Sequence, residues 1–162
     1  MIRPAVPDDV PSILGLVREL AEYERAAHEV VARELDYHAA LFGPRRFVEC
    51  DVVELDGEIV GMAMWFLRFS TWTGTACMYL EDLYVQPEHR RRGFGRALLV
   101  GLARRCVAEG WARFEWSVLD WNTPAREFYE SLGAHPLDEW VLHRLSGPEL
   151  ARFADTEPSS AP

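Results

Sequence analysis

Residues 79–105 constrain the fold of this chain more than any other stretch, because three patterns follow one another there. An apolar, strand-like run ends near Val85, an arginine- and glycine-rich turn follows, and apolar residues then recur every four positions from Phe94 to Cys106. A strand, a glycine-rich turn and a helix in this order present free backbone N–H groups and a helix N-terminus to a phosphate. The stretch therefore predicts a phosphate-binding turn between a strand and a helix.

The patterns on either side of this stretch predict a mixed sheet covered by helices, which is an α/β or α+β fold. Asp56-Gly57 is typical of a type I′ turn joining two antiparallel strands. The expected strands are residues 2–6, the two arms of 46–69, 76–85, 113–118 and 139–145, and the expected helices are 9–25, 33–42, 93–110 and 123–133. We expect a single domain over residues 1–150, followed by a short helical end and a disordered tail over 151–162.

The composition of the chain argues against nucleic acid and membrane as partners. The formal charge of −9 opposes binding to nucleic acid, and no run of residues is long and apolar enough to cross a membrane or to act as a signal peptide. The three cysteines lack metal-ligand or disulfide spacing, and the five histidines form no zinc motif, so we expect reduced core cysteines and no metal. These features favour a cytoplasmic protein.

The turn itself has the spacing R-x-x-G-x-G from Arg90 to Gly95. Glycines remove the Cβ atoms that would hold a phosphate away, which leaves the amides up to Arg96 free to converge on it. The Gly-Lys-Ser/Thr ending of a Walker loop and the third glycine of a dinucleotide fingerprint are both missing. The alternatives are an ordinary glycine turn with solvated arginines, or a nucleic-acid patch, which the acidic net charge disfavours.

Glu81 and Asp82 interrupt the apolar run of the preceding strand. Because adjacent strand residues point to opposite faces, one of these carboxylates would face into packing unless the strand has a bulge. Burying an unpaired carboxylate costs several kcal/mol, so a chain retains one mainly for function. The alternative is a strand edge where both carboxylates meet water.

Tyr129 lies on the expected helix that follows Asn122-Thr123-Pro124, next to an inward-facing Phe128. A tyrosine in such a position is more often a core residue whose hydroxyl is satisfied than a catalytic group. Taken alone, the pattern leaves both interpretations open.

Four ordered motifs together resemble one family. They are ELAEYE (residues 19–24), YLEDLYV (79–85), RRRGFG (90–95) and WNTPAREFYESLGA (121–134). In order and spacing they are similar to the GNAT superfamily of acetyl-CoA-dependent N-acetyltransferases, and within it to the diamine (spermidine/spermine) N-acetyltransferase group. The resemblance spans about residues 2–150 and implies a mixed, mostly antiparallel central sheet flanked by helices.

The resemblance also implies acetyl-CoA as cofactor and a set of residues that would bind it. Strand residues would pair with the pantetheine arm, the turn would hold the pyrophosphate, and the last helix would border the cofactor. The strand residues are Leu83, Tyr84 and Val85. The turn residues are Arg90, Arg91, Arg92, Gly93, Phe94, Gly95 and Arg96. The residues of the last motif are Asn122, Pro124, Ala125 and Tyr129.

For catalysis, the resemblance implies direct attack of an amine on the thioester, with Glu81 as general base through water and Tyr129 as general acid. The acceptor residues it implies are Tyr23, Glu24, Trp72, Glu81 and Asp82. Carboxylates with aromatic walls suit a small primary amine such as a polyamine, a diamine or a lysine-like amino acid.

Other interpretations stay open at this stage. The loop around Trp72 differs in length and content from the eukaryotic polyamine enzymes, so a protein lysine, an aminoglycoside or an amine toxin are alternative acceptors. A non-catalytic acyl-CoA-binding module is the remaining alternative. Dimerisation is common in the resembled group and would suit the apolar segment WVLHRL at residues 140–145, so we expect a homodimer.

Overall fold

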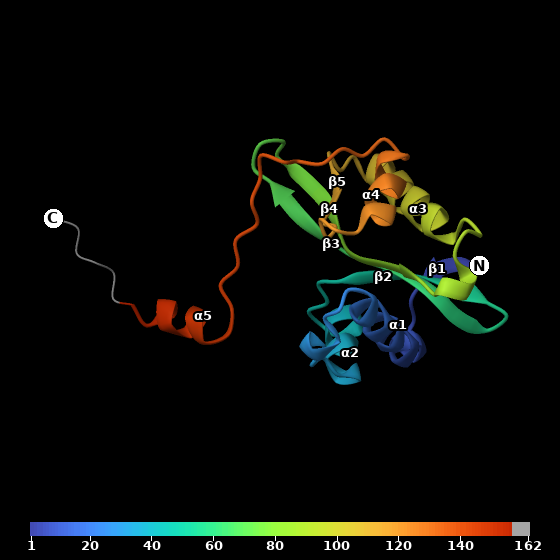
Figure 1. Cartoon of the computed structure of the whole chain (residues 1–162), viewed down its shortest axis with the longest axis horizontal. Coiled ribbons are helices and arrows are strands. Elements are labelled where there is room, and N and C mark those ends of the chain that lie inside the picture. Colours follow the sequence, from blue (N-terminus) through green and yellow to red (C-terminus); the bar gives the residue numbers. More distant parts are fainter. Residues whose placement is uncertain (157–162) are drawn as a thin grey trace. The chain divides into compact units, whose positions relative to one another are not determined.

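The protein, seen in a computed structural model that describes residues 1–156, is built around one five-stranded sheet (Figure 1). Its strands are β1 (Ile2–Pro4), β2 (Glu49–Leu55), β3 (Glu58–Ser70), β4 (Thr75–Val85) and β5 (Phe114–Trp116), and they lie in that order. The first three pairings are antiparallel and only β4–β5 is parallel. This arrangement confirms the predicted mixed, mostly antiparallel sheet.

The hairpin between β2 and β3 has the predicted turn. Asp56 and Gly57 have φ angles of 53° and 86°, and a type I′ turn requires positive φ at both central residues. The turn sets the pairing of Leu55 with Glu58 and of Glu54 with Ile59, and an irregularity after Glu54 then shifts the register so that Val53 pairs with Gly61.

Helices cover both faces of the sheet (Figure 1). The helices α1 (Val10–Tyr23) and α2 (Glu34–Phe42) pack on one face, where Ile13, Leu16 and Leu41 meet a fully buried cluster. The strand members of that cluster are Cys50, Val52, Met62, Met64 and Tyr84. Helix α3 (Phe94–Glu109) packs on the other face, where the Sγ atom of Cys106 lies 3.8 Å from the Sδ atom of Met78. Cys50, Cys77 and Cys106 are buried free thiols, as predicted.

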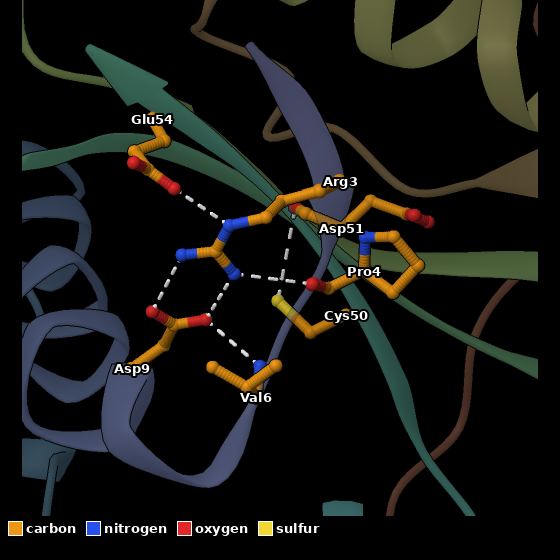
Figure 2. Close-up of polar contacts among 7 residues, drawn as sticks. All are labelled: Arg3, Pro4, Val6, Asp9, Cys50, Asp51 and Glu54. Carbon is orange, nitrogen blue, oxygen red and sulfur yellow. Dashed lines mark hydrogen bonds and ion pairs between the residues drawn. The ribbon is translucent and has the colours of Figure 1, made fainter. Parts of the chain in front are cut away.

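Ionic contacts fix α1 and α3 to the sheet. Figure 2 shows the guanidinium of Arg3 between two carboxylates, 2.6 Å from Asp9 and 2.7 Å from Glu54. Asp9 immediately precedes α1, and the hydrogen bond from Arg3 holds its pKa below the usual range. On the other face, buried Asp51 accepts hydrogen bonds from the Trp65 indole at 3.0 Å and from Arg105 of α3 at 3.3 Å.

The described chain falls into two compact units, the first ending at Ser117 and the second beginning at Val118. The second unit contains the helices α4 (Thr123–Glu130) and α5 (Gly147–Ala154). The strand expected at residues 139–145 is wrong, because Val141 and Leu142 are exposed and no described strand pairs with this segment. An apolar sequence pattern forms a strand only where a neighbouring edge is available to pair with it.

Part of the expected disordered tail, residues 157–162, lies outside the described residues. Over residues 1–156, no helix is long and apolar enough to cross a membrane. The same part of the chain contains no group of three or more histidine, cysteine, aspartate or glutamate side chains placed to hold a metal ion.

Candidate active site

A β-bulge in β4 places the two carboxylates that interrupt the apolar strand pattern. Met64 of β3 lies opposite Asp82 and Trp65 lies opposite Leu80, so Glu81 has no partner across the ladder. The side chain of Glu81 is exposed, whereas that of Asp82 is half-buried on the face covered by α1 and α2. The bulge therefore leaves Glu81 in solvent, and Asp82 is the carboxylate that faces the packed side of the sheet.

Asp82 lies in an acidic environment without a neutralising cation. Cys50 of β2 lies opposite Met64 of β3, and Met64 lies opposite Asp82 of β4, so the three residues form one row across the sheet. Burial, together with the charges of Glu81 and Glu24, raises the pKa of Asp82 to about 6. Burial also raises the pKa of Glu24, at the end of α1. Three carboxylates therefore meet where no basic side chain of the described chain forms an ion pair with Asp82.

Tyr37 on α2 is a neighbour of this acidic group that sequence reasoning missed. It packs against the buried cluster that contains Cys50 and Met64. Burial raises the pKa of Tyr37 to about 12, the Asp82 charge adds to that increase, and Arg18 opposes it. The spacing of α2 predicted its helical form, but nothing in the spacing indicated that this tyrosine would approach Asp82.

Beyond the bulge, β4 and β5 diverge. Strand β5 pairs with β4 only from Met78 to Leu80, so the following residues of β4, through Leu83 to Val85, have no partner on that side within the described sheet. Backbone groups on such an edge can pair with an extended ligand. The pantetheine arm of acetyl-CoA carries two amides, so this edge fits the group that the sequence implied.

The turn that follows β4 fits a pyrophosphate. Gly93 has a φ angle of 84° and immediately precedes α3, and the first intrahelical bond runs from the Ala97 N–H to the Gly93 carbonyl at 2.9 Å. The N–H groups of Phe94, Gly95 and Arg96 therefore have no acceptor within the helix. A Cβ atom added to Gly93 or Gly95 would meet no atom within 4 Å, so the space beside these donors is open.

Two arginines of the turn interact with other groups of the protein. The Nε atom of Arg90 donates to the Val85 carbonyl at 2.9 Å, and its guanidinium lies 5.3 Å and 5.4 Å from the ring centroids of Tyr23 and Tyr84. Arg92 contacts the His89 ring at 3.1 Å. Arg91 has a φ of 60°, which is uncommon for a residue other than glycine.

The expected residues of the last motif lie in the second unit. Asn122 is buried and caps α4 by accepting a hydrogen bond from the Ala125 N–H at 3.3 Å, with Pro124 in the first turn of the helix. The ring of Tyr129 lies 5.4 Å from that of Phe128. The sequence pattern favours Thr123 as the cap, and this prediction is wrong: Thr123 is already the first residue of α4, and the preceding Asn122 caps the helix. The predicted start of the helix, with Pro124 in its first turn, is confirmed.

The acceptor residues are not all brought together within one chain. Glu24, Glu81 and Asp82 influence one another electrostatically, as described above. Trp72 lies in the connection between β3 and β4 and is 79% exposed. The strand β4 rises about 3.3 Å per residue, so the distance along the strand from its Trp72 end to Asp82 is roughly 20 Å.

Comparison with known proteins decides the family. The model of the acetyltransferase (GNAT) family matches residues 14–134, which include the bulge, the turn and α4. The chain belongs to the GNAT acetyltransferase family. GNAT enzymes are N-acetyltransferases that take the acetyl group from acetyl-CoA, so acetyl-CoA is the donor here and the open β4 edge and turn suit it.

Relatives of this GNAT chain extend over nearly its whole length. It is 37% identical to a thialysine N-epsilon-acetyltransferase of Sus scrofa, over 95% of this chain and 96% of the relative. It is 30% identical to the L-ornithine N5-acetyltransferase NATA1 of Arabidopsis thaliana, over 92% of this chain and 85% of the relative. A solved integron cassette protein from the V. cholerae mobile metagenome has the same fold, with a TM-score of 0.81, 24% identity and coverage of 96% and 98% of the two chains.

Proposed function

We propose that this GNAT enzyme acetylates the primary amine of a small cationic acceptor, either a lysine-like amino acid such as thialysine or ornithine, or a diamine or polyamine. The observation that carries the proposal is the acidic group of Glu24, Glu81 and Asp82, whose charges act on one another and whose members form no ion pair with a basic side chain over residues 1–156. An alkylammonium would neutralise these charges, and the acidic net charge of the chain would attract it. The names of the relatives, which act on thialysine and ornithine, support the same class.

In the proposed mechanism each residue has one task. Bound acetyl-CoA supplies an activated acetyl thioester. Glu81 accepts the proton of the ammonium through a water molecule, because only the neutral amine is a nucleophile. A backbone N–H of β4 donates to the thioester oxygen as negative charge develops on it. Tyr129 donates its hydroxyl proton to the sulfur of the leaving thiolate.

The proposed cofactor contacts are largely those of the main chain. Leu83, Tyr84 and Val85 would pair with the pantetheine arm, and the N–H groups of residues 91–96 would hold the pyrophosphate. Asn122, Pro124 and Ala125, at the start of α4, are the remaining positions proposed to border the donor. A single catalytic domain over residues 1–150 is part of the same proposal.

We further propose a cytoplasmic homodimer. Three buried reduced cysteines suit a reducing compartment. Phe69 and Trp72 are 70% and 79% exposed, and Val141 and Leu142 are 74% and 80% exposed, which is apolar surface that a second copy would cover. Sedimentation equilibrium at micromolar concentration tests this point, and a monomer would refute it.

The proposed function is tested by incubating the pure protein with acetyl-CoA and a panel of thialysine, ornithine, lysine, 1,3-diaminopropane and spermidine. Free CoA is measured with a thiol reagent and the products by mass spectrometry. We expect acetylation of at least one of these amines. The chain contains no lysine, so its own side chains add no acetyl-lysine signal when a peptide or an aminoglycoside is tried as a competing acceptor. Coenzyme binding without turnover on any amine would identify a non-catalytic module and refute the proposal.

A further inference from the structure

Two contacts, one helical turn apart, join the end of α1 to the start of the cofactor turn. The Gln86 Nε2 atom donates to Glu19 Oε1 at 2.9 Å, and the Arg90 guanidinium lies 5.3 Å from the Tyr23 ring centroid. Glu19 and Tyr23 are four residues apart in α1 and so lie on one face of this helix, while Gln86 and Arg90 flank the short turn Pro87–His89. We call Glu19, Tyr23, Gln86 and Arg90, together with Tyr84, the α1 seam.

The centre of the α1 seam is the side chain of Arg90. Its guanidinium lies between two tyrosine rings, 5.3 Å from the centroid of Tyr23 and 5.4 Å from that of Tyr84, within the range of a cation–π contact. Its Nε atom is already used in the 2.9 Å hydrogen bond to the Val85 carbonyl. The side chain therefore turns back from the turn toward α1, and the phosphate-binding role that the motif suggested for it is not needed to explain its position.

The other side of the α1 seam leads to the acceptor site. Tyr23 is the last residue of α1, and the next residue, Glu24, contributes to the acidic group around Asp82. Tyr84 lies two residues beyond Asp82 on the same strand and is buried in the core. A shift of Arg90 would thus move the groups proposed to hold the amine.

We propose that Arg90 is a positioning residue that ties the cofactor turn to the acceptor end of α1, and that its side chain does not bind the pyrophosphate. The proposal rests on the proposed function for its link to the amine. It changes the assignment of the whole arginine cluster to the cofactor, because the Arg90 N–H donates to the Pro87 carbonyl at 3.2 Å and only the amides of residues 91–96 would serve the phosphate.

The test compares Arg90→Met with Arg91→Met, which removes the same charge from the same turn at a residue that, within residues 1–156, stacks on no tyrosine of α1. The dissociation constant of CoA is measured by calorimetry at about 50 and 200 mM salt, because a lost phosphate contact lowers both the affinity and its salt dependence. We expect Arg90→Met to bind CoA no more weakly than Arg91→Met. Its KM for the amine should rise by about tenfold, the factor that corresponds to losing one cation–π contact.

A CoA affinity at least tenfold weaker in Arg90→Met than in Arg91→Met, with a smaller salt dependence, would overturn the proposal. Arg90→Lys provides the second variant if Arg90→Met folds poorly. Lysine keeps the charge but cannot both stack and donate from Nε, so the amine KM should stay raised. An amine KM in Arg90→Lys equal to that of the wild-type protein would also argue against a role for the stacked guanidinium of Arg90.

A double variant separates this proposal from the proposed function. In urea unfolding, Arg90→Met and Tyr23→Leu should be non-additive, because the first change already removes the contact that the second would remove. If the wild-type protein acetylated no amine, the proposed function would fail, yet CoA binding and this cycle would still show whether Arg90 holds α1 in place. Additive effects of the two substitutions would refute the proposed role of Arg90.

Discussion

Replacing Asp82 with asparagine should stabilise the protein at neutral pH and weaken it as an enzyme. Burial and two neighbouring carboxylates raise the pKa of Asp82 from 3.8 to about 6. Each pKa unit corresponds to about 1.4 kcal/mol, so holding Asp82 ionised in the folded state costs about 3 kcal/mol. Asparagine has the same shape and no charge, so it removes this cost.

The sign of the effect fixes its pH dependence. Because the folded-state pKa of Asp82 is raised, the folded protein holds this proton more tightly than the unfolded chain does. The free energy of unfolding of the wild-type protein therefore falls by the contribution of Asp82 as pH rises from about 4 to about 6, whereas that of the variant does not. At pH 7.5 the variant should be about 3 kcal/mol more stable, which corresponds to a melting temperature roughly 6–12 °C higher for a chain of this size.

Urea unfolding followed by tryptophan fluorescence from pH 4 to pH 7.5 measures this difference. Glu58→Gln at the exposed first residue of β3 removes a charge at a solvated position and should change stability by less than about 0.5 kcal/mol. The amine KM of Asp82→Asn should rise even as stability increases, because the lost charge is the one proposed to hold the ammonium. An Asp82→Asn variant no more stable than wild type at pH 7.5, or one whose advantage persists unchanged at pH 4, would refute the reasoning.

Three further substitutions test separate features. Arg91→Gly should stabilise the protein by about 1 kcal/mol in urea unfolding, since glycine adopts a φ of 60° without strain; a loss of stability would contradict this. Asp51→Ala should cost about 2–3 kcal/mol, because it leaves the Trp65 indole and Arg105 without their acceptor, and Asp51→Asn should cost less; equal losses would point to packing alone. Tyr129→Phe should lower kcat by about 10²-fold while CoA affinity stays within a factor of two, and an unchanged kcat would remove Tyr129 from the mechanism.

Local patterns predicted the parts of the fold that local physics controls. The Asp56-Gly57 turn followed from the backbone angles that a type I′ turn demands, and those angles are present. The cost of burying a carboxylate indicated that the strand is irregular or exposed at Glu81-Asp82 or that one carboxylate is kept for function, and the register shift shows that the strand has a bulge. The start of α4 followed from the tolerance of a first helical turn for Pro124, although the cap is Asn122 and not Thr123.

Contacts between distant segments could not be predicted in the same way. The position of Arg90 between Tyr23 and Tyr84 depends on how α1 meets the end of β4, which no residue spacing specifies. The approach of Tyr37 to Asp82 depends on the packing of α2 in the same manner. The segment 139–145 has the composition of a strand but no described neighbour, because pairing is a property of the whole sheet rather than of the segment.

The short pairing of β4 with β5 has a practical consequence for mapping the donor site. If the edge from Leu83 to Val85 and the amides of the turn hold acetyl-CoA, most of the recognition is carried by main-chain atoms that every amino acid possesses. Alanine scanning would then report almost nothing along this strand, and evolution could vary these side chains with little effect on the donor. Amide hydrogen exchange, with and without CoA, reads the backbone directly and is the appropriate way to outline the site.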